Sequence, residues 1–336
     1  MNYAWRLVVS VLLFAQAAAG QQVRRLPPVD DDAPGEVELL AWFPEQRPNL
    51  ANPALVDGPP EPLPPPDPTD VPGTRKGAFQ KVVLEAAWLG SGTGPDDVGM
   101  NDFEAKAVLG FPCPTRNSPL VVTPGYAVHW FDGPSRTDLP PATYDSYAQF
   151  RWLSRIGARW GVDVAVTPGW YSDYEQGSWR AFRVTGYGAG AYTWSPVARF
   201  VLGAAWLDRD DVPVLPIGGV ILTPNEDTTL ELLAPRPRIA RRVYWSGNPS
   251  PWMEDWIYFG GEMGGGTWAV QRANGAEDVL NTRDYRVILG IERKKLGGMG
   301  LVFEAGYVFG RRLEYNVGEE VVRPSDTVML RGSLTY

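Results

Sequence analysis

One histidine, His129, is the side chain best suited to move protons near neutral pH, and the sequence contains no other histidine. Asp132 and Asp145 follow it along the chain. A histidine beside carboxylates can activate water or a hydroxyl group, which is the chemistry of a hydrolase. No nucleophile motif accompanies these residues. We therefore interpret His129 as a polar lining residue and expect no enzymatic activity, with a hydrolase that uses His129 as the least favoured alternative.

Three further segments contain residue types that could bind a ligand. The acidic "LDRDD" at 207–211 could hold Ca²⁺, but it lacks the spacing of an EF-hand and reads as solvated loop acids. The "GGEMGGG" at 260–266 has no Lys-Ser/Thr of a phosphate loop and predicts a turn or bulge. The basic "PRPRIARR" at 235–242 could hold lipopolysaccharide phosphates or line an anion-attracting constriction, although ion pairing with loop acids is favoured. We expect neither a metal nor a cofactor.

The N-terminus predicts export. Residues 1–20 combine a basic start, a short apolar run and small residues, which is typical of a cleaved signal peptide. Residues 21–78 are acidic and rich in proline, which predicts a disordered periplasmic linker. Its apolar stretch 36–46 could contact a periplasmic partner. The single cysteine, Cys113, has no intramolecular partner, and the net charge of −8 without a basic stripe argues against nucleic-acid binding.

From residue 79 the sequence alternates between apolar and polar residues with a period of two, which predicts an all-β domain over 79–336. The polar face often has charged residues in the middle of a strand. In a membrane barrel such residues line the lumen while the apolar face contacts lipid. The predicted lumen-lining residues are Lys81, Glu85, Glu104, Lys106, His129, Arg151, Arg183, Arg286, Glu304 and Arg331.

Alternation alone fits a soluble sandwich as well as a barrel, so other features decide between them. Short connections at 154–159, 195–198, 224–227 and 294–300 alternate with longer, proline-containing ones, as in outer-membrane barrels. Tryptophan and tyrosine residues concentrate near the predicted strand ends, as expected at membrane interfaces. The last strand ends on Tyr336, which resembles the signal recognised by the barrel-assembly machinery. We therefore predict a closed antiparallel up-and-down transmembrane β-barrel in the bacterial outer membrane, with lipid and lipopolysaccharide as its surroundings.

The expected number of strands is 12–14, and residues 217–273 are where the count is least certain. Two of the short pieces there could form one long strand. The predicted strands are 79–89, 101–111, 119–131, 143–154, 160–173, 180–194, 199–208, 217–224, 228–235, 254–263, 266–273, 281–292, 299–311 and 325–336.

The stretches "LPPATYDSYAQFRW", "VTPGWYSDYE", "FRVTGYGAGAYTWSP" and "VLGAAWLDRDDVPVLPIGGVILTPNEDTTLELLAPRPRIA" together resemble an uncharacterised bacterial outer-membrane β-barrel family, classified as a domain of unknown function. The resemblance covers about residues 79–336, and it implies the fold and the location. It implies no activity and no functional residues.

The pentapeptides "VTPGY" at 122–126 and "VTPGW" at 166–170 place a proline and a glycine inside predicted strands. Proline cannot donate a hydrogen bond to a sheet. We therefore predict a bulge or a sharp bend at Pro124 with Gly125, and at Pro168 with Gly169, where glycine makes room inside the barrel.

Three functions follow from a barrel of this size. A porin-like passive channel for small polar solutes is favoured, because 12–14 strands enclose a narrow pore. The alternative is a non-conducting structural barrel with a plugged lumen and an N-terminal arm that tethers partners. A hydrolase at the barrel mouth comes third.

Overall fold

The computed structural model describes residues 77–92, 94, 96–115, 118–133, 138–175, 179–209, 212–246, 253–295, 299–317 and 321–336. The predicted signal peptide, nearly all of the linker and the stretch 36–46 lie outside these residues. Strands make up most of the described part, and the 3-10 turn η4 (Trp179–Ala181) is a short helical element in it. Among the described residues, no helix has the length and hydropathy needed to cross a membrane.

The strands are β1 (Phe79–Leu89), β2 (Gly99–Thr115), β3 (Ser118–Asp132), β4 (Ala142–Ile156), β5 (Trp160–Ser172), β6 (Phe182–Ser195), β7 (Ala198–Trp206), β8 (Val214–Asn225), β9 (Thr228–Ala234), β10 (Arg238–Ser246), β11 (Met253–Gly264), β12 (Thr267–Gln271), β13 (Glu277–Lys295), β14 (Gly300–Tyr315), β15 (Val321–Val322) and β16 (Thr327–Thr335).

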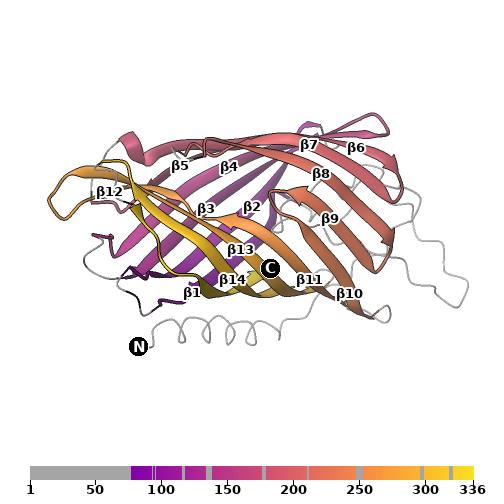
Figure 1. Cartoon of the computed structure of the whole chain (residues 1–336). Coiled ribbons are helices and arrows are strands. Elements are labelled where there is room, and N and C mark those ends of the chain that lie inside the picture. The colour runs from indigo at the N-terminus through magenta and orange to yellow at the C-terminus, as the bar shows by residue number, and fades with distance from the viewer. Residues whose placement is uncertain are drawn as a thin grey trace, which may run out of the picture.

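The sheet closes on itself into a barrel (Figure 1). Each ring strand pairs in an antiparallel manner with its neighbours in the chain, from β1 to β11 and then through β13, β14 and β16. The pairing of β16 with β1 closes the ring, for example at Leu84↔Leu334. Fourteen of the sixteen strands form this ring, and β12 and β15 lie outside it. The predicted closed antiparallel barrel is therefore confirmed.

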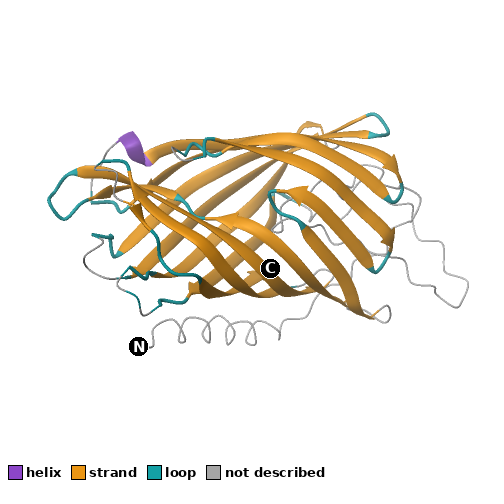
Figure 2. Ribbon diagram, in the orientation of Figure 1, coloured by secondary structure: helices purple, strands orange, loops and turns teal. Residues whose placement is uncertain are grey.

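The two ends of the barrel differ (Figure 2). At one end, which we call the turn end, β4 and β5 are joined by residues 157–159, β6 and β7 by 196–197, and β8 and β9 by 226–227. At the other, the loop end, residues 90–98 and 133–141 make longer connections. The short and long connections predicted from the sequence therefore separate to opposite ends.

Side chains alternate between the two faces of the wall, as the pleat of a strand requires. In β13, Leu289 is 62% exposed and Ile291 is 54% exposed, whereas the flanking Ile288 and Glu292 are buried. The same pattern runs around the ring. The outer face is a surface of exposed apolar side chains, and the inner face contains most of the charged ones.

The predicted strand count of fourteen is right partly because two errors cancel. β10 coincides with the basic run, and the sequence analysis did not assign it as a strand. Its inward positions are Arg238, Ala240 and Arg242, so the charge that made it look like a loop in fact faces the interior. Conversely, the predicted strand 266–273 corresponds to β12, which does not belong to the ring.

The prolines of the two repeated pentapeptides do not bulge their strands. The pairing of β3 with β4 keeps one register from Leu120↔Trp152 to Trp130↔Ala142, through Pro124↔Ala148. β5 likewise pairs with β6 in one register through Pro168↔Val184. On the other edge the register is also unchanged, but the ladder is interrupted beside each proline, between Lys106↔Gly125 and Leu109↔Val122 and between Tyr147↔Gly169 and Phe150↔Val166. The predicted bulge is therefore wrong, and the alternative of a sharp bend stays a prediction.

The glycines of the pentapeptides do make room inside the barrel. Gly125 and Gly169 both pair with Tyr147, one from each side. A Cβ atom on Gly125 would lie 2.8 Å from Cε2 of the Tyr147 ring, and one on Gly169 would lie 2.9 Å from the Cβ of Tyr147. The ring therefore lies over a groove without side chains, and its hydroxyl donates a hydrogen bond to Glu104.

Candidate functional site: the barrel interior and its loop-end cap

β12 continues β11 after a bend. Both strands pair with β13 in one register, through Gly264↔Asp284 and then Thr267↔Asn281. Gly265 has a φ of +105°, and a Cβ atom there would lie 2.6 Å from the carbonyl carbon of Thr282. Only glycine tolerates this backbone conformation and this close approach. The glycine cluster "GGEMGGG", predicted to be a turn or bulge, is therefore the bend that redirects the strand.

Beyond the bend, β12 crosses the loop end of the barrel. Its free edge pairs in parallel with β5 at Ala269↔Ser172. Six ring strands separate β5 from β13 in either direction, so the two lie on opposite sides of the ring. β12 therefore bridges the mouth from wall to wall.

An apolar cluster forms around this bridge. It joins β12 to the β1–β2 connection, to β13 and β14, and to partly buried residues of β3 and β5. Its buried members are Val98, Trp268, Val270, Leu280, Leu313 and Tyr315, with Phe131, Leu139, Tyr171 and Val322 packed against them. We call β12 and this cluster the loop-end cap. Trp268 was expected near a membrane interface, but it is only 3% exposed and lies inside the cap.

Acidic residues of the rim accept hydrogen bonds from the cap and hold it to the wall. Trp268 Nε1 donates to Asp145 Oδ1 of β4 at 2.6 Å. The backbone nitrogen of Gln271 donates to Asp173 Oδ2 at 2.7 Å. The turn after β12 is held by Arg272, which pairs with Asp138 at 2.8 Å. Each of these contacts joins β12 or its turn to a different segment of the rim.

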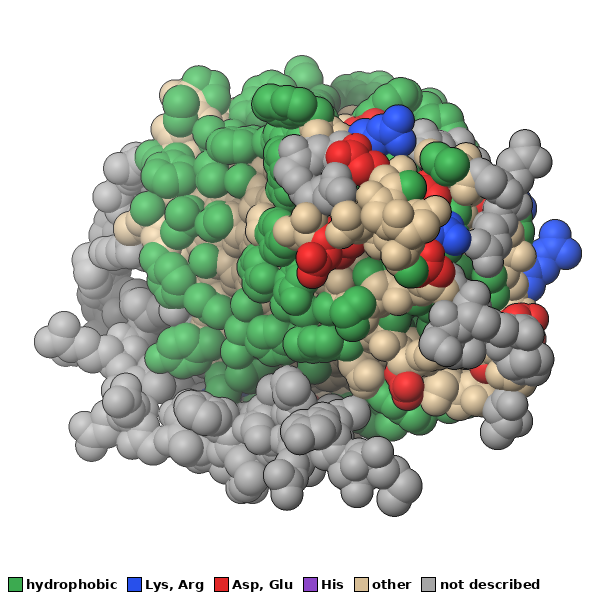
Figure 3. Space-filling view, turned by 90° about the vertical axis from the view of Figure 1, so that its left-hand side faces the viewer, with side chains coloured by type: hydrophobic (Ala, Val, Ile, Leu, Met, Phe, Trp, Pro, Cys, Tyr) green, Lys and Arg blue, Asp and Glu red, His purple; other side chains and the backbone are tan. Residues whose placement is uncertain are grey.

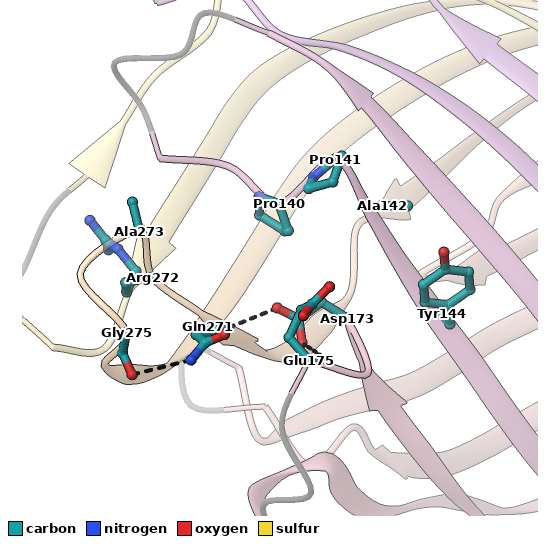
Figure 4. A pocket seen from close by; sticks show the side chains of 10 residues that line it. All are labelled: Pro140, Pro141, Ala142, Tyr144, Asp173, Glu175, Gln271, Arg272, Ala273 and Gly275. Atoms are coloured by element: carbon teal, nitrogen blue, oxygen red, sulfur yellow. Dashed lines mark hydrogen bonds between the residues drawn. The ribbon is translucent and has the colours of Figure 1, made fainter.

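A cavity of about 380 Å³ lies at the rim between the β12 turn and the ends of β4 and β5 (Figure 4). Pro140, Pro141 and Tyr144 line it on one side, and Asp173 lies opposite. Both carboxylate oxygens of Asp173 accept backbone N–H groups, from Glu175 and Gln271. Asp173 therefore serves the structure of the cap rather than a bound ligand.

The loop end is uneven in chemistry (Figure 3). Hydrophobic side chains cover most of the wall seen from this end, whereas acidic and basic side chains gather together on one part of the rim. Asp97 belongs to the β1–β2 connection at this end. Backbone N–H groups of Ser325 and Gly94 donate to its carboxylate and lower its pKa below the ordinary value.

His129 connects the inner wall to the cap. Its Nδ1 lies 2.7 Å from Asp102 Oδ1, and its Nε2 lies 3.2 Å from Asp145 Oδ2. Each ring nitrogen therefore has a carboxylate oxygen within hydrogen-bonding distance. The ring also packs against Trp268, with 5.1 Å between centroids. In this arrangement both ring nitrogens contact carboxylates, and His129 holds Asp145, which also accepts the hydrogen bond from Trp268 in the cap.

Asp145 was expected near His129 and lies there, whereas Asp132 does not. The second carboxylate is Asp102 of β2, and Asp132 instead lies 3.5 Å from the hydroxyl of Ser91. The sequence analysis could have found Asp102, because it has the inward parity of Glu104 on a strand that pairs directly with β3.

A ladder of ion pairs covers the inner wall from β10 to β16. Arg331 contacts both Glu304 and Glu262, the latter at 2.9 Å. Arg286 lies between Glu262 and Asp284, at 3.3 Å and 2.6 Å. All five side chains are at least partly buried, and each charge has an opposite neighbour. Buried charges require such pairing, because an isolated one would shed its charge or destabilise the fold.

Two smaller groups occupy the wall from β2 to β6. Arg151 and Asp163 form a bidentate pair with almost no exposure, and the hydroxyl of Tyr187 donates to the same carboxylate at 3.2 Å. Glu104 accepts from Lys106 at 2.8 Å. These contacts run within one strand or between neighbouring strands, along the wall rather than across the barrel.

The predicted lumen-lining residues all have inward parity in the structure. Lys106, Arg151, Arg286 and Glu304 are buried, and the remaining ones are partly buried: Lys81, Glu85, His129, Arg183 and Arg331, with Glu104. Arg183 turns toward the loop end and donates to the carbonyl oxygen of Asp208 at 2.6 Å.

Several acidic partners of the inward arginines were not predicted from the sequence. Asp163, Glu262 and Glu292 each neutralise an inward arginine, but period-two parity would have placed them on the same face. The basic run pairs with acids as favoured, although its partners are on strands as well as in loops: Arg238 pairs with Glu292, and Arg242 with Glu254 and Asp227.

The "LDRDD" segment is not simply a row of solvated acids. Asp208 accepts the backbone N–H of Val184 at 2.9 Å. Arg209 is buried and donates to the carbonyl oxygen of Thr282 on β13 at 2.7 Å. Residues 210 and 211 lie outside the described part. Within that part, no group of three or more His, Cys, Asp or Glu side chains is arranged to hold a metal ion.

Comparison with known proteins gives no family. No family model matches the chain, and no curated protein matches it. The resemblance to an outer-membrane barrel family therefore stays a prediction.

Three solved structures share a similar arrangement at low identity. A bacterial polysaccharide outer membrane secretin is 11% identical, with a TM-score of 0.36 over 76% of this chain and 97% of that one. The transport unit of the Escherichia coli autotransporter AIDA-I is 10% identical, with a TM-score of 0.27 over 79% and 91%. A mutant of the Rh. blastica porin is 10% identical, with a TM-score of 0.27 over 77% and 99%. At these scores, the fold assignment depends on the strand pairing described above.

Proposed function

We propose that this chain is an outer-membrane β-barrel that works as a gated passive channel for small polar solutes. The membrane placement is supported by the outer face, where exposed apolar side chains cover the ring, since monomeric soluble proteins rarely expose patches of this extent. Exposed aromatic residues at both ends of the strands, such as Trp160 and Trp206, match the interfacial girdles of such barrels.

The observation that carries the gating is the loop-end cap. β12 crosses the mouth between opposite strands, above walls lined by paired charges. A polar inner surface favours water and polar solutes, whereas the apolar cap excludes them. In this proposal the closed state is the one in which β12 pairs with β5, and opening requires β12 to leave β5.

A non-conducting barrel with a plugged lumen is the second candidate, because the same cap would seal it permanently. A reversible lock on the cap separates the two. In a Cys113→Ser background, Ala269→Cys with Ser172→Cys places two thiols on paired residues, where a disulfide can form.

The test is single-channel recording in planar bilayers. The reduced double-cysteine protein is expected to open and close, the oxidised protein to stay closed, and reductant to restore openings. Trp268→Ala, which removes the indole from the cap, should raise the open fraction, whereas Trp194→Ala at the exposed turn end should not. Folded wild-type and Trp268→Ala proteins that both remain silent would overturn the channel and leave the plugged barrel.

A further inference from the structure

The barrel wall extends less far toward the loop end at β9 and β10 than at their neighbours β8 and β11. The last β8–β9 pair toward the loop end is Gly218↔Ala234, and the first β10–β11 pair is Arg238↔Gly260. Val214–Ile217 of β8 and Gly261–Gly264 of β11 continue beyond these pairs without a strand neighbour on that edge. Figure 1 shows the β9–β10 hairpin ending well short of its neighbours. We call this break in the sheet the notch.

The notch lies at membrane depth in the placement proposed above. Trp206, 50% exposed, pairs with Val214 at the upper end of the β8 edge. Tyr285, 42% exposed, pairs with Met263 on the β11 edge. These aromatic residues mark the interface, and four strand residues extend about 13 Å below it. The apolar band of such barrels is about 25 Å tall, so the notch opens into its outer half.

An open sheet edge in hydrocarbon is costly, because each unpaired backbone group loses its hydrogen bonds to water. The notch reduces this cost. Pro216 on the β8 edge and Pro235 and Pro237 at the base have no N–H group to satisfy. The N–H of Gly261 donates to the carbonyl oxygen of Pro237 at 3.0 Å. The backbone around the notch is therefore suited to apolar surroundings.

The inner wall beside the notch is apolar. From β6 to β9, inward side chains form a buried cluster of Ala189, Ala191, Val201, Ile217, Ile221 and Leu233. Ile217 lies on the β8 edge itself. Arg199 and Glu231, which both pair with Ile221, lie on the same face and limit the strip on the side of the turn end. An apolar strip inside a polar barrel, reached through a break in the wall, fits a hydrocarbon chain.

A positively charged side chain, Arg236, lies at the base of the notch. The side chain of Arg236 is 38% exposed and lies 3.7 Å from Glu262, a longer contact than the other arginines of the ladder make. Glu262 already accepts from Arg331 and Arg286. Arg236 is therefore the ladder arginine best placed to bind an incoming carboxylate or phosphate.

We propose that the notch is a lateral opening that admits an anionic single-chain amphiphile, with its acyl chain along the β6–β9 strip and its headgroup at Arg236. Three interstrand steps separate β8 from β11, about 14 Å between strand axes, which is wide enough for one chain. The proposal depends on the membrane placement given above but not on conductance, so a silent barrel could still bind the amphiphile.

The test is photo-crosslinking on the unaltered full chain in phosphatidylcholine nanodiscs. The probe is a long-chain fatty acid with a diazirine at its methyl end, and labelled residues are mapped by mass spectrometry. Outward residues such as Leu202 and Leu232 contact lipid and serve as the positive control. The expected result adds label on inward Ile217, Ile221 or Leu233. Label confined to outward residues would overturn the proposal.

The headgroup is tested with the methyl ester of the same probe. Inward labelling relative to Leu202 should fall at least fivefold with the ester, and similarly with the acid on Arg236→Gln. The matched control is Arg155→Gln, at the exposed turn end of β4. Inward labelling that is equal for acid and ester overturns the assignment of an anionic ligand. Since the ester comparison uses the unaltered chain, it stands even if Arg236→Gln does not fold.

Discussion

Gly125 pairs with Tyr147, and the effect of Gly125→Ala on stability should depend on whether the tyrosine is present. Adding a methyl group at Gly125 puts a carbon 2.8 Å from Cε2 of the Tyr147 ring and closer still to Cζ. The ring has to move, and its hydroxyl then leaves Glu104. We therefore expect Gly125→Ala to destabilise the barrel only when the tyrosine is present.

The magnitude follows from two losses. A hydrogen bond to a charged group contributes about 1.5–3 kcal/mol, and overpacking costs about 1–3 kcal/mol. Gly125→Ala should therefore lower the free energy of unfolding by about 3 kcal/mol. In a Tyr147→Ala background the clash disappears, and alanine in a strand is favoured over glycine by about 0.5–1 kcal/mol. Gly125→Ala in this background should then be neutral or stabilising.

The assay is equilibrium urea unfolding in detergent micelles, followed by tryptophan fluorescence, with heat-modifiable migration as the check on folding. Gly188→Ala is the matched control, because a Cβ atom there has no neighbour closer than 4.0 Å. An equal cost for Gly125→Ala with and without the tyrosine ring would refute the reasoning, since the cost would then belong to the backbone.

Three further outcomes follow from the described contacts. Arg151→Met leaves Asp163 buried without its cation and should cost about 3–5 kcal/mol in urea unfolding, whereas Arg151→Met with Asp163→Leu should recover most of it. Gly265→Ala, at a φ of +105°, should cost about 1–3 kcal/mol in the same measurement and raise the open fraction in bilayer recordings, because the bend into β12 is strained. The fold lowers the pKa of Asp97, so the contribution of its carboxylate to stability is present at pH values above its ordinary pKa. This contribution is lost as the pH falls below about 4. Protection of the Ser325 amide from hydrogen exchange should decrease there in the wild type and be independent of pH in Asp97→Asn.

The ring could be predicted because its information is local. Each strand shows its inner and outer faces through a period of two, and the short connections identify one end. β10 was missed because Arg238 and Arg242 are spaced like loop charges, and only their partners on other strands show that they face inward. Parity within one strand could not reveal this, but a search for opposite charges of matching parity could have.

The cap and the notch could not be predicted from the sequence, for a different reason. The sequence of β12 is mostly apolar and contains Trp268, so it resembles a ring strand with an interfacial aromatic residue. What removes it from the ring is the positive φ of Gly265 and the pairing of Ala269 with Ser172, about 100 residues earlier in the chain. The short strand at 228–235 was predicted and matches β9, but its partner β10 was not predicted, so the short hairpin that lowers the wall could not be inferred from the sequence.

The notch and the cap also depend on each other. A ring strand paired along both edges cannot leave the wall without breaking two ladders of hydrogen bonds. Beyond Gly261, whose N–H bonds to Pro237, β11 has no strand neighbour on one edge among the described residues, because β10 begins only at Arg238 opposite Gly260. It can therefore turn inward at Gly265 while it keeps its register with β13. The low wall at β9 and β10 is thus the reason that β11 can supply a cap. The cap over the loop end and the proposed lateral opening therefore have one cause, the β9–β10 hairpin that stops short of the loop end.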